Sequence, residues 1–221
     1  DEKEKNWLKN KNNTINIGYL DNNLPYSDMD QNGQLVGTLS LLTKKLSNQF
    51  DITVKAINYK DSDALTKALD DKEIDILGPC FCDFYLTECL GTIQTNPILT
   101  TIPIIIYKGD KVNLDKIAVT SKSLFNSDVV KIFFPKSQLY FCENEKACLN
   151  AVKTGKANAT ITNLGRLNFY PSLLGYSYSE FVDPVNIGFI TAESEACTIM
   201  NKTIALASEN IKRLGYRESK I

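Results

Sequence analysis

Residues 7–46 read WLKNKNNTINIGYLDNNLPYSDMDQNGQLVGTLSLLTKKL, and this stretch contains the beginning of the fold. Branched apolar residues alternate over 15–20, which predicts a β-strand. Residues 21–34 are dense in Asp, Asn, Pro and Gly and predict a loop. Apolar residues at helical spacing over 35–46 then predict an amphipathic helix with two lysines in its last turn. This order is typical of an α/β protein.

The same alternation of strands and helices continues along the rest of the chain. Further strands are predicted at 51–58, 73–78, 101–107, 115–120, 137–142, 158–163 and 185–191, and further helices at 61–69, 126–134, 143–155 and 192–213. The strand over 73–78 is expected to stop at Gly78 and Pro79. The pattern predicts two α/β lobes, each a mostly parallel sheet flanked by helices, with ligand-binding loops at the carboxyl ends of the strands.

Composition and charge exclude several classes of function. A net charge of −1 offers nothing that would attract a nucleic-acid backbone or an anionic membrane. The longest apolar run, TTIPIIIY at 100–107, is far shorter than the roughly 20 residues that span a bilayer. The charged start, DEKEKNWLKNKNN, does not resemble a signal peptide. We therefore expect a soluble protein, a mature secreted form or an excised soluble part of a longer protein.

The chain contains no histidine, which removes the usual base of a Ser or Cys nucleophile and the commonest transition-metal ligand. We expect no catalytic residues, no metal and no cofactor. Six cysteines leave three alternatives, namely buried apolar thiols, disulfides of an exported domain, or a metal site. The short-spaced pairs, CFC and CENEKAC, do not match the paired C-x-x-C pattern of zinc sites.

Residues 7–46 resemble the opening of a type 2 periplasmic-binding, or Venus-flytrap, domain of the bacterial extracellular solute-binding family 3. The shared features are a strand, LPY, an Asp/Asn/Gly turn, and a Gly before the first helix. WLK directly before the first strand is typical of sensor domains that precede bacterial histidine kinases or diguanylate cyclases. Three further stretches follow in the family's order: ALDDKEIDILGP (68–79), NPILTTIPIIIYKG (96–109) and CLNAVKTGKANATITN (148–163).

The resemblance implies a specific division of the chain. Residues 14–104 and 187–221 would form lobe 1, residues 105–186 would form lobe 2, and residues 1–13 would be a lead-in segment. Two crossing strands, near 103–107 and 185–189, would form the hinge. A ligand that bridges the lobes would stabilise their closed arrangement.

The resemblance also implies which anchors of an amino-acid ligand are missing. The family's carboxylate-binding Arg occurs in a T-x-E-R context, and here LTEC places Cys89 at that position. The acidic residue that binds the ligand's amine corresponds to Asn163. A thiol cannot hold a carboxylate as a bidentate guanidinium does. An α-amino acid is therefore a poor candidate ligand.

The remaining candidate ligand contacts are uncharged or mildly polar for the most part. Tyr26 is either an aromatic contact or a packed loop residue, Asp21 either a contact or a turn residue, and the hydroxyls of Ser121 and Ser123 either ligand contacts or loop caps. The full candidate set is Asp21, Tyr26, Cys80, Phe81, Asp83, Ser121, Ser123, Thr162 and Asn163. Such a site suits a neutral polar or aromatic ligand, and it equally suits a site that has lost binding and transmits mechanically.

The cysteine spacing predicts one disulfide. Cys142 ends a predicted strand and Cys148 lies in the first turns of the next helix. A reversal from strand to helix can bring such residues within the roughly 4.4–6.8 Å Cα separation of a disulfide. Export to an oxidising compartment would favour a bond between Cys142 and Cys148.

These observations favour a non-catalytic, extracytoplasmic ligand-sensing domain of a membrane-tethered signalling receptor. Its partners would be a small-molecule ligand and, through the C-terminus, the rest of the receptor; a homodimer is left open. The first alternative is the solute-binding component of an ABC transporter. The second is an enzyme of the same fold, such as a cyclic-acid dehydratase, with Asp83 or Glu88 as acid–base group.

Overall fold

The computed structural model describes residues 1–82, 91–170 and 172–213, and the chain forms two compact units. The first unit contains Asp1–Thr100 and the segment that begins at Asn186, and the second unit is Thr101–Val185. The chain therefore passes from one unit to the other at Thr100–Thr101 and returns at Val185–Asn186. The sequence placed these borders at 104/105 and 186/187, and it kept residues 1–13 apart from the first unit.

The first unit is built on a mixed sheet in the order β4-β1-β5-β13-β6, with β7 paired to β13. β1 runs parallel to β4 and β5, whereas β13 is antiparallel to β5 and β6. The strands are β1 (Thr14–Leu20), β4 (Thr53–Tyr59), β5 (Ile76–Cys82), β6 (Ile93–Gln94), β7 (Leu99–Thr101) and β13 (Val185–Thr191). A separate two-stranded ribbon joins β2 (Asp28–Met29) and β3 (Leu35–Val36).

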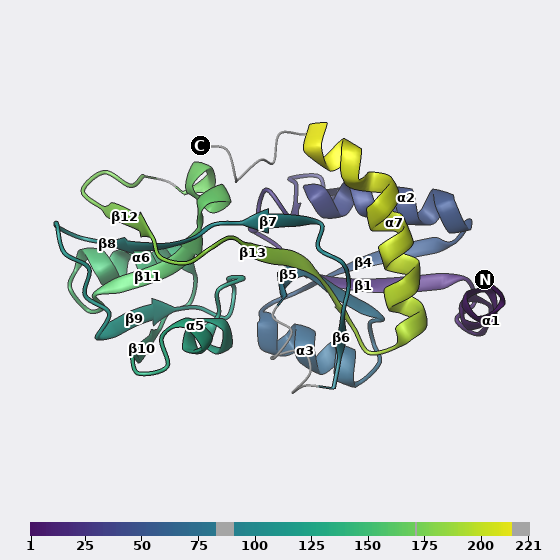
Figure 1. The fold of residues 1–221 in the computed structure, drawn as a ribbon, viewed down its shortest axis with the longest axis horizontal. Helices are drawn as coiled ribbons and strands as arrows, with labels where there is room; N and C mark the ends of the chain where they lie inside the picture. The colour runs from purple at the N-terminus through teal and green to yellow at the C-terminus, as the bar shows by residue number, and fades with distance from the viewer. Residues whose placement is uncertain (83–90, 171, 214–221) are drawn as a thin grey trace. The chain divides into compact units, whose positions relative to one another are not determined.

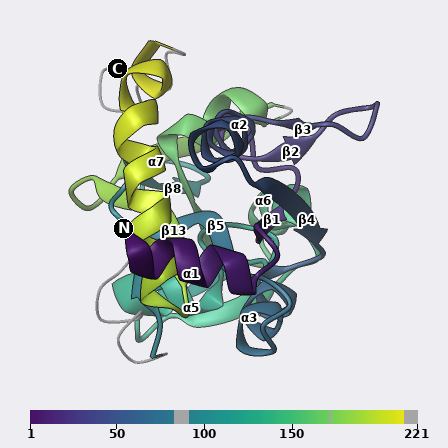
Figure 2. The same ribbon diagram turned by 90° about the vertical axis from the view of Figure 1, so that its right-hand side faces the viewer.

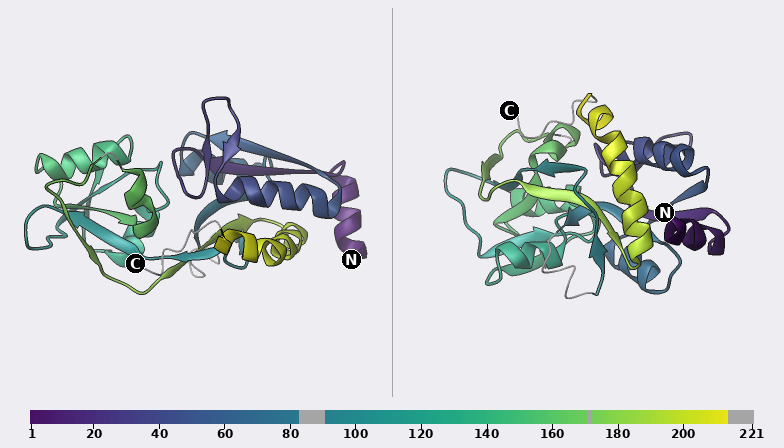
Figure 3. Two further views of the ribbon diagram at one scale, coloured as in Figure 1. Left: turned by 90° about the horizontal axis from the view of Figure 1, so that it is seen from above. Right: turned by 45° about the vertical axis from the view of Figure 1, so that its right-hand side comes forward.

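Helices cover both faces of this sheet. α2 (Thr38–Phe50) and α7 (Ser194–Arg213) pack against each other on one face, and α3 (Ser62–Asp70) lies on the other (Figures 1 and 3). Under α3, apolar side chains of the helix and the sheet form a buried cluster that contains Leu20, Leu65, Leu69, Ile74 and Leu77. The burial of these side chains supplies the main favourable free energy of this layer.

The second unit has a five-stranded sheet in the order β10-β9-β11-β8-β12. β9 is parallel to β10 and β11, and β8 is antiparallel to β11 and β12. Its strands are β8 (Pro103–Tyr107), β9 (Lys116–Val119), β10 (Gln138–Phe141), β11 (Ala159–Asn163) and β12 (Ser177–Glu180), and its helices are α5 (Ser127–Phe133), α6 (Glu145–Lys153) and the 3-10 helix η1 (Leu164–Phe169). α6 packs on β9 and β11. The predicted two-lobed α/β fold is confirmed, with mixed rather than mostly parallel sheets.

The start of α2 differs from the prediction. The predicted helix began at 35, but residues 35 and 36 form β3 and Gly37 adopts φ 93° and ψ −170°. The backbone N–H groups of Thr38 and Leu39 donate to the carbonyls of Pro25 and Tyr26 at 3.1 and 3.0 Å. The loop that contains LPY therefore caps α2 with its own backbone, because the first N–H groups of a helix have no partner within it.

β5 also differs from the prediction, since it continues through Gly78 and Pro79 to Cys82. Gly78 has φ +141°, and a Cβ at this position would lie 2.8 Å from the carbonyl oxygen of Gly188. The neighbouring β13 changes register between Gly188 and Ile190. Glycine and proline here accommodate an irregular pairing instead of ending the strand.

The predicted lead-in segment contains a helix, α1 (Glu2–Asn10), that lies across α7 (Figure 2). The Trp7 ring N–H donates to the Glu193 carboxylate directly before α7, and the Glu4 carboxylate accepts from Lys202 within α7. Lys11 pairs with Asp75 at 2.5 Å. Charged residues of the N-terminal segment thus attach α1 to the rest of the first unit.

Lys202→Met is expected to lower the free energy of unfolding by about 1–2 kcal/mol. Lys202 Nζ lies 2.8 and 2.7 Å from the two Glu4 oxygens, and Glu4 is only 3% exposed. Burial alone raises the pKa of Glu4, but the hydrogen bond from Lys202 helps to bring it below its ordinary value. The loss of a partner from a fully buried carboxylate generally costs about 3–5 kcal/mol. Here the expected loss is smaller, because Lys202 is 44% exposed and water screens the pair.

Urea unfolding followed by the fluorescence of Trp7, the only tryptophan, measures this effect in the unit that contains it. Lys5→Met, on the exposed side of α1, is the matched control and should change little. Adding Glu4→Gln to Lys202→Met should recover part of the loss. Equal stabilities of Lys202→Met and Lys5→Met would contradict the expectation.

Candidate functional site

Asn163 is the last residue of β11 and the N-cap of η1. Its Oδ1 accepts the backbone N–H of Arg166 at 3.1 Å, and its side chain is fully buried. This bond fixes the amide so that Nδ2 points elsewhere, and within the described part of the chain Nδ2 has no hydrogen-bond partner. Burying an amide N–H without an acceptor costs free energy, so Asn163 offers an unused donor at the carboxyl end of a sheet strand.

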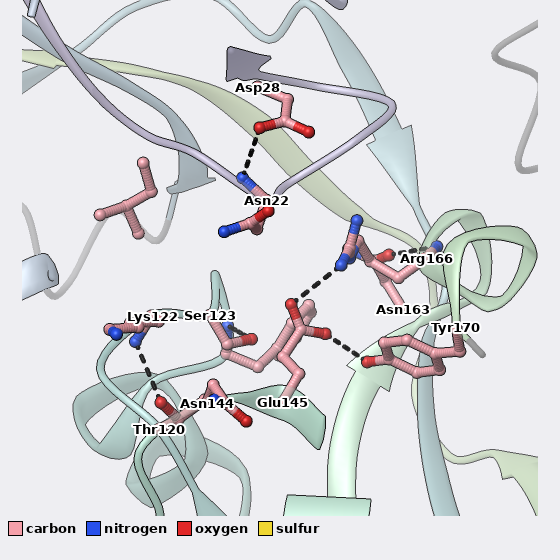
Figure 4. Close-up of polar contacts among 12 residues, drawn as sticks. Asn22, Asp28, Thr120, Lys122, Ser123, Asn144, Glu145, Asn163, Arg166 and Tyr170 are labelled. Carbon is pink, nitrogen blue, oxygen red and sulfur yellow. Dashed lines mark hydrogen bonds and ion pairs between the residues drawn. The ribbon is translucent and has the colours of Figure 1, made fainter. Parts of the chain in front are cut away.

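The Glu145 carboxylate lies between Arg166 and Tyr170 (Figure 4). Arg166 Nη2 is 3.1 Å from Oε1, and the Tyr170 hydroxyl donates to Oε2 at 2.5 Å. The side chains of Arg166 and Glu145 are 9% and 16% exposed. A buried charge pair of this kind depends on hydrogen bonds to its remaining atoms, and here Tyr170 supplies one of them.

Aromatic rings complete the surroundings of Arg166. Its guanidinium carbon lies 5.9 Å from the Phe169 ring centroid and 5.6 Å from that of Tyr170, within the range of cation–π attraction. Burial, followed by the charge of Glu145, raises the pKa of Tyr170 well above its ordinary value. Tyr170 therefore keeps its proton at neutral pH and acts as a donor to Glu145.

A small cavity adjoins this network inside the second unit. Its lining includes Thr120, Ser123, Glu145, Thr160 and Tyr170 together with apolar residues of β9 and β11. Its volume of about 10 Å³ is close to the room that a single water needs, and its polar lining suits one.

The predicted serines have mainly local bonds in the structure. Ser123 is buried and its hydroxyl oxygen accepts the N–H of Phe125 at 3.1 Å. Ser121 is half-buried, and the neighbouring Thr120 hydroxyl accepts the N–H of Lys122. The N-cap of α5 is Asn126, so neither serine begins a helix. These contacts correspond to loop caps, although Ser123 also lines the cavity.

In the first unit, the candidates follow β1. Asp21 is half-buried, and Tyr26 is fully buried, as a packed loop aromatic would be. Ser27 donates to the Leu20 carbonyl at 2.7 Å and fixes this loop to the end of the strand. Asn23 is 1% exposed and, within the described residues, its Nδ2 has no hydrogen-bond partner. Each unit therefore has an unused amide donor after a strand of its sheet.

The candidates near the end of β5 lie within the strand, not in a following loop as predicted. Phe81 is buried and pairs with Ile187 of β13, and Cys80 is half-buried. Asp83, Glu88 and Cys89 fall outside the described residues.

The predicted disulfide between Cys142 and Cys148 is not formed, because the structure has both residues as free thiols. Cys148 is buried among Ala118, Ala151 and Ala157, and Cys142 packs against this cluster. Burial raises the pKa of both thiols, which disfavours the thiolate that disulfide exchange requires. Among the described residues, no three Cys, Asp or Glu side chains are grouped to hold a metal ion.

Sequence reasoning missed Glu145, Arg166 and Tyr170. They come from α6, η1 and the residue after η1, so no spacing rule connects them. The available signal was a lone Arg in NLGRLNFY, an otherwise uncharged stretch that follows a buried strand. A buried Arg generally requires an acidic partner.

No protein-family model matches the sequence, and a comparison with curated proteins finds no significant match. Solved structures do match. The periplasmic VFT2 domain of Bordetella pertussis BvgS has a TM-score of 0.77 at 16% identity, covering 98% of this chain and 97% of that one. An ancestral amino-acid-binding protein, a precursor of cyclohexadienyl dehydratase, has a TM-score of 0.73 at 20% identity over 96% and 97% of the two chains.

Arginine-bound ArgBP from T. maritima, as a Gly52Ala mutant, gives a TM-score of 0.72 at 15% identity over 91% of this chain and 98% of that chain. These similarities show that the chain has the fold of type 2 periplasmic-binding and Venus-flytrap domains. The resemblance inferred from the sequence is confirmed at the level of the fold. None of the helices in the described residues is long and apolar enough to cross a membrane.

Proposed function

We propose that this chain is an extracytoplasmic, non-catalytic ligand-sensing domain of a membrane signalling receptor. Its ligand would be a small neutral polar or aromatic molecule that presents hydrogen-bond acceptors to the carboxyl end of β11. The fold supports binding at such strand ends, where ligands of open α/β sheets lie.

The unused Nδ2–H donor of Asn163 carries the proposal. A carbonyl or hydroxyl oxygen of a neutral ligand would satisfy it, whereas an ammonium group would bring a second donor to a position that lacks an acceptor. The carboxylate of Glu145, which pairs with Arg166 in the turn that Asn163 begins, is already bonded by Arg166 and Tyr170. Both observations disfavour an α-amino acid, although two of the similar solved structures are amino-acid-binding proteins.

A thermal-shift panel of sugars, nucleosides, aromatic acids and α-amino acids tests the proposal. A ligand present at 100 times its Kd stabilises the protein by about 2.7 kcal/mol. We expect stabilisation by a compound rich in acceptors and none by free amino acids. Asn163→Asp, which keeps the acceptor and removes the donor, should weaken the binding of that compound. Micromolar affinity of the unaltered protein for a common α-amino acid, measured by calorimetry, would overturn the proposal.

The choice of a receptor domain over a transporter component rests on the WLK segment. The WLK segment, typical of sensor versions of the fold, forms part of α1 and attaches to α7 through Trp7. Sequencing the complete reading frame separates the alternatives. A membrane-spanning helix after Ile221 would mean a receptor, whereas a lipobox Cys before Asp1 with a stop after Ile221 would mean a transporter component.

A further inference from the structure

Arg166 is surrounded by the groups that a protein uses to bind a free guanidinium ion. Glu145 supplies the carboxylate at 3.1 Å, and the rings of Phe169 and Tyr170 lie 5.9 and 5.6 Å from the guanidinium carbon. Tyr170 donates to the second carboxylate oxygen and so holds Glu145 in place. A carboxylate combined with aromatic rings is a common arrangement for the recognition of organic cations.

We propose that the second unit contains a guanidinium-binding subsite made by Glu145, Phe169 and Tyr170, and that Arg166 occupies it as a built-in counter-ion. Arg166 would therefore act as a specificity-determining residue. Because it neutralises Glu145, the unit has no free carboxylate in this network to attract a ligand's cation. The inference extends the proposed function. It depends on that function in one respect, namely that the ligand is neutral.

The position of Arg166 in the chain supports this role. Its backbone N–H is bonded to Asn163, so the amide donor at the end of β11 and the counter-ion of Glu145 are fixed within the same turn. A lysine could not replace it, since an ammonium lacks the planar fork that matches a carboxylate and stacks on rings. Replacement of Arg166 by a small residue should leave the Glu145 carboxylate without its guanidinium partner and with space beside it.

Rescue by an added cation tests the inference. Methylguanidinium at millimolar concentration, below the denaturing range, should raise the Tm of Arg166→Ala in a saturable way. It should leave the unaltered protein unchanged, because Arg166 already fills the subsite. Methylammonium and urea are the controls for charge and for shape, and each should bind at least about tenfold more weakly.

The double variant Arg166→Ala/Glu145→Gln removes the anion and should abolish the rescue. If Arg166→Ala does not fold alone, the refolded yield with and without methylguanidinium is the readout, and Arg166→Gln, which keeps part of the side chain, provides a second background. Rescue that is equal in the double variant, or absent in both Arg166 variants, would overturn the inference. Either result leaves the ligand panel on the unaltered protein interpretable, so the two proposals fail separately.

Discussion

Gly37→Ala is expected to lower the free energy of unfolding of the first unit by about 3 kcal/mol or more. Gly37 has φ 93° and ψ −170°, a backbone conformation that is almost confined to glycine. An added Cβ would lie 2.7 Å from the Tyr26 carbonyl oxygen and 2.9 Å from that of Pro25. These oxygens accept the first N–H groups of α2, so relief of the collision would break the cap of that helix.

Gly109→Ala separates strain from collision. Gly109 also has a positive φ, +82°, but no atom lies within 4 Å of the added Cβ. It should cost only the backbone strain, about 1–2 kcal/mol. The free energies of unfolding of the two variants are compared by urea unfolding. Far-UV circular dichroism follows both variants, and Trp7 fluorescence also follows Gly37→Ala. A Gly37→Ala protein as stable as Gly109→Ala would show that the loop yields and that the backbone cap contributes little.

Much of the fold was predictable from local patterns. Alternating branched residues located β1 and β11, and the apolar run at 101–107 located β8, because strands buried in a core require such residues whatever surrounds them. The errors lie where partners distant in sequence decide the backbone. β5 continues through Gly78 because the neighbouring β13 changes register there. The chain leaves β3 at Gly37, where loop carbonyl oxygens occupy the space that a Cβ would need.

The candidate site was less predictable, for a related reason. Asn163 was found through the resemblance to the family, which has an acidic residue at this strand end, and the missing charge was visible in the sequence. The position of its amide depends on Arg166, and the buried guanidinium of Arg166 pairs with Glu145 from another helix. For Tyr26 the sequence left open a ligand contact or a packed loop aromatic, and in the structure the ring is buried and the residue's carbonyl caps α2. A sequence pattern identifies residues of suitable chemistry, whereas tertiary partners decide which of them remain available.

Glu145→Leu is expected to destabilise the second unit by about 3–5 kcal/mol. The substitution leaves the Arg166 guanidinium, 9% exposed, without its carboxylate and leaves the Tyr170 hydroxyl without its acceptor. The loss of one partner from a buried pair is costly because the remaining charge stays desolvated. Far-UV circular dichroism follows the thermal unfolding of both units, whereas Trp7 fluorescence follows only the first unit. A lower Tm by circular dichroism with an unchanged Tm by fluorescence therefore assigns the effect to the second unit.

Two comparisons decide whether the pair itself causes this loss. Glu143→Leu removes a carboxylate from an exposed position two residues earlier and should change stability by less than about 0.5 kcal/mol. Glu145→Leu/Arg166→Met removes both charges, and an apolar pair of similar volume often equals or exceeds a buried ion pair in stability. The double variant should therefore be more stable than Glu145→Leu. If it is less stable instead, the Arg166 stem and its ring contacts, not the charge pair, hold β11, η1 and α6 together.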